Sequence, residues 1–170
     1  WHPDRALPHR ARPRDPARSV VIDWSLIEVW PLAEGVRRSV WAYPVLESVH
    51  IAAFAALVGS VLLLELRVFG VQRALPLPAF ARLAVRTSLA AFAVAAASGS
   101  LLFISAATEL VANPAFRLKL VLILMAGVNA VVFHARDSLR RQDRWARWQA
   151  GASLLIWLAV IGAGRMIAYI

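Results

Sequence analysis

Three ionisable side chains lie inside apolar stretches of this chain: Glu47 and His50 in the first stretch, and Arg165 in the last. An ionised side chain in lipid is costly unless it is paired or hydrated, so each of these residues marks a candidate functional site. A guanidinium group can hold an anion such as a haem propionate. An imidazole can bind iron or donate a hydrogen bond to a quinone carbonyl. The three residue types together predict a site for haem b or a quinone.

The elements that must position these residues are four apolar stretches, each about long enough to cross a bilayer as a helix. They run from Pro44 to about Leu64, from about Arg82 to Ala107, from about Ala115 to Ala135 and from Trp148 to Ile170. Of the 170 residues, 60% are hydrophobic, whereas a soluble domain has about 45–50%. We therefore predict an all-α fold: an integral membrane four-helix bundle that occupies residues 41–170 as one domain.

The segment before the bundle divides into two parts. Residues 1–19 are rich in arginine and proline, which predicts a disordered basic arm. Residues 20–40 alternate apolar and charged residues in an amphipathic pattern, which predicts an interfacial helix lying flat beside the bundle. Pro31 is expected to kink that helix or to begin a new one.

Helical rise places the candidate residues at a common depth. His50 and Arg165 each lie roughly 8 Å below the outer face, at about 1.5 Å per residue. Ser100 and Ser105 lie at the outer end of the second stretch. We therefore expect Glu47, His50 and Arg165 to form one polar layer with these serines, near the outer face.

His134 is a second candidate metal ligand, near the inner end of the third stretch. Its vertical distance from His50 is roughly 20 Å. The axial ligands of one haem must lie at nearly the same depth, so these two histidines do not share one macrocycle. His134 either ligates a separate group or faces the lipid headgroups.

Two other classes of function remain open. A Glu–Arg pair, with a histidine bridging to a serine, would also tie helices together in a structural or assembly subunit of a larger membrane complex. A small transporter of a metal ion or an acid is a weaker alternative, because the sequence shows no internal repeat. The chain has no cysteine, which excludes disulfides and thiolate metal sites. Without a phosphate-binding glycine loop, a Ser/His/Asp set or a zinc motif, we expect no independent catalytic activity.

The net charge of +9 comes largely from arginines at the ends of the apolar stretches. Both loops that join stretches one to two and three to four are rich in arginine. Positive-inside reasoning puts these loops in the cytoplasm and both termini outside. The expected partners are the lipid bilayer and other membrane subunits, and not nucleic acid, because no basic surface remains once the helices are in lipid.

A set of short motifs from Trp24 to Ile170 resembles a little-characterised family of small bacterial four-helix inner-membrane proteins. The matching residues are Trp41, Tyr43-Pro44, Glu47, His50, Leu66-Arg67, Asn113 through Lys119, Asn129, His134 and Gly164-Arg165. The general shape also resembles copper-resistance D and cytochrome b561-type membrane proteins. The resemblance implies a multi-pass protein of the bacterial inner membrane, and it implies no catalytic residue.

Overall fold

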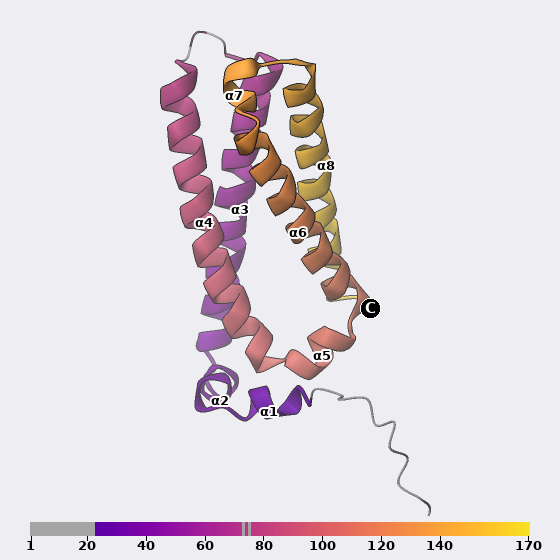
Figure 1. The fold of residues 1–170 in the computed structure, drawn as a ribbon. Coiled ribbons are helices and arrows are strands. Elements are labelled where there is room, and N and C mark those ends of the chain that lie inside the picture. The colour runs from indigo at the N-terminus through magenta and orange to yellow at the C-terminus, as the bar shows by residue number, and fades with distance from the viewer. Residues whose placement is uncertain (1–22, 73, 75) are drawn as a thin grey trace, which may run out of the picture.

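The computed structural model describes residues 23–72, 74 and 76–170. These residues form helices and no strand, in the order α1 (Ser25–Glu28), α2 (Pro31–Arg38), α3 (Ala42–Phe69), α4 (Leu77–Ser105), α5 (Ala107–Ala112), α6 (Pro114–Ala135), α7 (Ser138–Arg141) and α8 (Arg144–Met166). Four of them, α3, α4, α6 and α8, are long and apolar enough to cross a bilayer, and Figure 1 shows them as one bundle. The chain is a multi-pass membrane protein with the predicted all-α architecture. The predicted basic arm at 1–19 lies outside the described residues.

The bundle has two different ends. Helices α1, α2 and α5 lie at one end with the C-terminus, and we call this the α2 end (Figure 1). The end of α3, the start of α4 and α7 lie at the other end, the α7 end. The arginines of the α6–α8 connection belong to the α7 end. That the α7 end faces the cytoplasm stays a prediction.

Single residues at the helix ends determine where α3 stops and where α6 begins. Gly70 ends α3 in a left-handed conformation, with φ 101°, which glycine adopts without steric cost. The N–H of Gly70 donates to Arg67 O at 3.1 Å, and that of Val71 to Leu66 O at 3.0 Å. The side chain of Asn113 caps α6 by accepting from the N–H groups of Ala115 at 2.9 Å and Phe116 at 3.2 Å.

Three of the predicted span boundaries are corrected by the structure. Helix α4 begins at Leu77 instead of Arg82, because Pro78 sits in its first turn, where the missing N–H has no helical partner to lose. Helix α8 begins at Arg144 instead of Trp148, since Asp143 caps it by accepting from Ala146 N at 2.8 Å. Helix α3 continues past Leu64 to Phe69.

Apolar packing joins all four spanning helices at mid-bundle. One buried cluster takes at least one residue from each of them: Leu57, Ala91, Ala126, Trp157 and Val160. A second cluster nearer the α7 end consists of Val68, Phe133, Ala146 and Ala150. Large apolar side chains on the outer surface, such as Leu63, Leu89, Leu124 and Leu155, are exposed, as expected for residues that face lipid.

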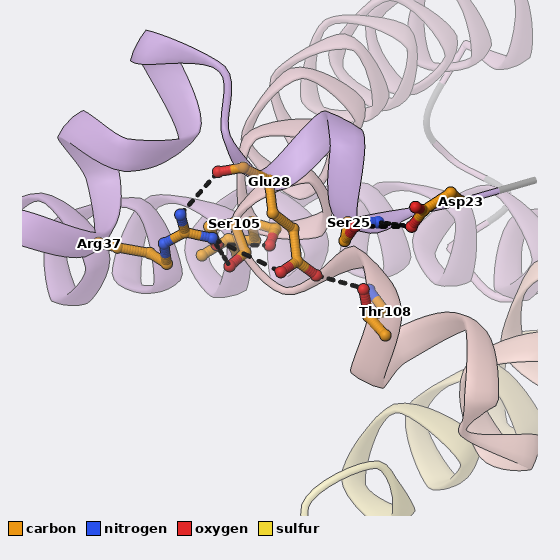
Figure 2. Close-up of polar contacts among 7 residues, drawn as sticks. Asp23, Ser25, Glu28, Arg37, Ser105 and Thr108 are labelled. Atoms are coloured by element: carbon orange, nitrogen blue, oxygen red, sulfur yellow. Dashed lines mark hydrogen bonds and ion pairs between the residues drawn. The ribbon is translucent and has the colours of Figure 1, made fainter.

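Polar contacts attach α1 and α2 to the end of the bundle (Figure 2). One guanidinium nitrogen of Arg37 donates to Glu28 O at 2.6 Å, and the other donates to Ser105 O at 3.4 Å. The carboxylate of Glu28 accepts from Thr108 N at 2.7 Å. This hydrogen bond, with the charge of Arg37, holds the pKa of Glu28 below its usual value. The predicted amphipathic segment is two helices, and Pro31 begins the second.

Candidate functional site

The imidazole of His50 joins α3 to α4 near the α2 end. Its Nδ1 lies 2.9 Å from Ala95 O and 3.1 Å from Ser98 Oγ. Ser98 Oγ in turn donates to Val94 O at 2.7 Å, so the hydroxyl presents a lone pair to the ring. His50 is half-buried and Ser98 is buried. The serine contact is the one expected if a histidine bridges two helices.

This arrangement determines which ring nitrogen carries a proton. A carbonyl oxygen only accepts hydrogen bonds, so Nδ1 of His50 must be the donor to Ala95 O. In the neutral imidazole, Nε2 is then the atom with a free lone pair. Histidines that bind metals commonly donate their other N–H to a backbone carbonyl in this way. The chain thus holds His50 in the tautomer that a metal or a hydroxyl donor requires at Nε2.

Close approach of the ring to α4 depends on Gly99. A Cβ placed on Gly99 would lie 2.9 Å from Cε1 of His50 and 3.3 Å from its Nδ1. Real Cβ atoms do not tolerate the shorter distance, so any larger residue would displace the ring. Gly99 therefore provides the space that the imidazole occupies, and Ala95, one turn earlier on the same helix, is buried.

Lys119 brings a cation into the same region from α6. Its side chain is half-buried, and Nζ lies 5.8 Å from the ring centroid of Phe54, which is one helical turn from His50. The ammonium also lies beside Gly164 of α8, 3.4 Å from where a Cβ would stand. It is close enough to act electrostatically on His50. None of the ion pairs in the described part of the chain involves Lys119.

We call His50, Ser98, Gly99, Lys119 and Gly164 the His50–Lys119 layer, to which all four spanning helices contribute. Asn113 helps to position it, since its amide donates to Ile167 O at 3.1 Å and to Ile170 O at 2.8 Å. These bonds fix the start of α6 against the end of α8. Lys119 and Gly164 lie a few residues from that junction.

The structure does not bring Glu47 and Arg165 to His50 as an ion pair. Glu47 is exposed. Arg165 is also exposed and donates to the hydroxyl of Tyr169 at 2.7 Å, with its guanidinium 5.0 Å from the Tyr169 ring. A residue turns by about 100° around a helix relative to its neighbour. Because Gly164 faces Lys119, Arg165 points elsewhere.

The other predicted site residues are not among the hydrogen-bond partners found for the imidazole in the described part of the chain. Ser100 is exposed, and Ser105 is buried with its hydroxyl donating to Leu102 O at 2.7 Å. His134 is exposed near the α7 end, and its Nδ1 lies 2.8 Å from Ala130 O on its own helix. No group of three or more His, Asp or Glu side chains that could hold a metal ion occurs within residues 23–72, 74 and 76–170.

Lys119 is a site residue that the sequence reasoning missed, because its charge lies close to the predicted start of the third apolar stretch. It lies five residues after the first residue of α6, Pro114, which places it roughly 7.5 Å along the helix. The depth argument used for His50 would have found it at a similar level.

No protein-family model, curated protein or solved structure matches this chain.

Proposed function

We propose that the His50–Lys119 layer binds a redox group, haem b in the first instance, and that the protein passes electrons to or from a membrane partner. The observation that carries this proposal is the bond from Nδ1 of His50 to Ala95 O at 2.9 Å. It leaves Nε2 of the neutral ring as a ligand atom and orients the ring rigidly, as the backbone partner of a metal-binding histidine does.

The positive charge of the His50–Lys119 layer is also suited to haem b. Haem b carries two propionates, and Lys119 offers an ammonium without a carboxylate partner among the described ion pairs. A bound haem would supply a one-electron couple. The residues of this chain would hold it: His50 through Nε2, Lys119 through charge, and Ser98 by keeping the imidazole in place.

A quinone is the alternative occupant. A quinol hydroxyl would donate to Nε2 of His50, and a quinone carbonyl would accept from Lys119. The absorption spectrum separates the two cases, since only haem gives a Soret band, whereas a quinone is recovered by solvent extraction and identified by mass.

The test uses the full chain purified from membranes in mild detergent or nanodiscs. We expect a Soret band that disappears in His50→Ala and weakens in Lys119→Gln. The matched control is His134→Ala, because that histidine is exposed and bonded only to its own helix among the described contacts, and it should keep the band. A folded, colourless wild-type protein that also yields no stoichiometric quinone would refute the proposal.

A structural role is the second candidate, and the contact of His50 with Ala95 and Ser98 is the observation that favours it. Under this reading the imidazole serves only to tie α3 to α4. His50→Gln separates the two roles, since its amide still donates to a carbonyl but is a poor ligand for iron. Full retention of thermal stability and of co-purifying subunits in His50→Gln, with no chromophore in the wild type, would support the structural role.

A further inference from the structure

A second site lies in the other half of the bundle, at Glu65 on α3. This residue is only 5% exposed. Both of its carboxyl oxygens are buried and have no hydrogen-bond partner within the described part of the structure. The first apolar stretch was predicted to end at about Leu64, just before Glu65, but α3 continues to Phe69. The carboxyl is therefore an interior group.

Among the described residues, no cation forms an ion pair with Glu65 that would neutralise it. Ser153 of α8 is close enough to interact with the carboxyl, although outside hydrogen-bond geometry. One turn further along α3, Val68 packs in the apolar cluster with Phe133, Ala146 and Ala150. None of the ion pairs formed by residues 23–72, 74 and 76–170 includes Glu65.

The charged residues of α4 and α8 in this half of the bundle are exposed arginines. Arg82 and Arg86 of α4 are exposed, and so are Arg144 and Arg147 of α8. Arg67 is half-buried two residues further along α3 and has interactions of its own. Within the described residues, none of these guanidinium groups forms an ion pair with Glu65.

We propose that Glu65 is a proton-binding site, whose buried carboxyl carries a proton in the resting protein and exchanges it with water at the α7 end. A buried carboxylate without a partner is strongly disfavoured. Protonation removes the charge and requires no ligand besides the carboxyl itself. Gly70 ends the helix five residues later, so the path to the aqueous surface is roughly 7.5 Å along the helix.

A metal cation is a poorer occupant than a proton. Calcium and magnesium take six or more ligands, most of them oxygen atoms, whereas the carboxyl of Glu65 has Ser153 beside it and an apolar cluster one turn away. The proposal does not rest on the redox group, because the two sites lie in different halves of the bundle. If the experiments refute one of these two proposals, the other is not affected.

The test is infrared spectroscopy of the full chain in nanodiscs. We expect the wild type at neutral pH to show the C=O stretching band of a protonated carboxylic acid. The band should be lost in Glu65→Gln and retained in Glu47→Gln, the matched control, since Glu47 is an exposed carboxyl on the same helix. A wild-type protein without this band, or a band unchanged in Glu65→Gln, would overturn the proposal.

Labelling of the wild type keeps the test decisive if Glu65→Gln does not fold. Dicyclohexylcarbodiimide is an apolar reagent that modifies protonated carboxyls, and mass spectrometry of peptides locates the adduct. We expect the adduct on Glu65 rather than Glu47, with labelling that falls about tenfold per pH unit once the carboxyl ionises. Equal labelling of the two residues, or labelling independent of pH, would contradict a proton at Glu65.

Discussion

Replacing Gly99 by alanine should separate the His50 contact from general helix packing. The new Cβ would lie 2.9 Å from Cε1 of His50. Either the ring stays and the site is overpacked, at about 1–3 kcal/mol, or the ring moves and loses its bond to Ala95 O, at about 1 kcal/mol. Alanine favours a helix over glycine by up to about 1 kcal/mol, which offsets part of this cost.

The matched control is Gly127→Ala on α6, where an added Cβ would meet nothing within 4 Å. We expect Gly99→Ala to be less stable than Gly127→Ala by about 1–3 kcal/mol in the free energy of unfolding. Unfolding in detergent micelles, followed by circular dichroism, measures this difference. Gly99→Ala should also weaken any chromophore that depends on His50, whereas Gly127→Ala should not.

A double-mutant cycle identifies the cause of the loss. In a His50→Ala background the imidazole is absent, so the added methyl group on residue 99 has space and should no longer destabilise the protein. The coupling between the two substitutions should exceed about 0.5 kcal/mol, the limit expected for independent sites. Additive effects, or equal stability of Gly99→Ala and Gly127→Ala, would refute the packing of His50 against Gly99.

Three further predictions concern the contacts that surround the site. Asn113→Ala removes the cap of α6 and both bonds to the end of α8, and should lower the unfolding free energy by about 2 kcal/mol in the same assay. The pKa of Glu28 is lowered in the folded protein. The stability that its ionised carboxylate contributes is therefore present above the pKa of the unfolded state and is lost as the pH falls through the pKa of the folded state. The difference in Tm between the wild type and Glu28→Gln should vanish in acid. Arg165→Ala removes an exposed side chain, so it should change stability by less than about 0.5 kcal/mol and leave any chromophore intact, and loss of the chromophore would return Arg165 to the site.

The architecture could be predicted from sequence because its signals are local. Length and composition identify four helices that can cross a bilayer, and α6 begins at Pro114, one residue before the predicted start of the third stretch. The predicted helix boundaries were less accurate where a residue that usually ends a helix, such as proline, is tolerated inside it. Pro78 sits inside the first turn of α4, where a proline costs no hydrogen bond, so the helix starts earlier than its apolar run.

The candidate site was harder to predict because depth along a helix does not give direction around it. The depth argument placed His50 and Arg165 at similar levels, but Gly164 rather than Arg165 faces the ammonium of Lys119. One residue of difference along α8 rotates a side chain by about 100°. Which face of α8 packs inward depends on contacts with other helices, such as those of Trp157 and Val160, and these contacts are not visible in a single sequence.

Lys119 and Glu65 carry groups of opposite charge within the bundle, and neither forms an ion pair with any residue that the structure describes. Their separation decides whether they can compensate one another. Lys119 lies at the level of Phe54, and Glu65 is eleven residues further along α3, roughly 16 Å away along the helix axis. At that separation their attraction is about 1 kcal/mol at an effective dielectric constant of 20, against about 4 kcal/mol for a pair in contact. The charges are too far apart to neutralise each other, so each requires local compensation. Under the two proposals made above, a proton would neutralise the carboxyl at Glu65, and an anionic ligand such as a haem propionate would neutralise the ammonium at Lys119.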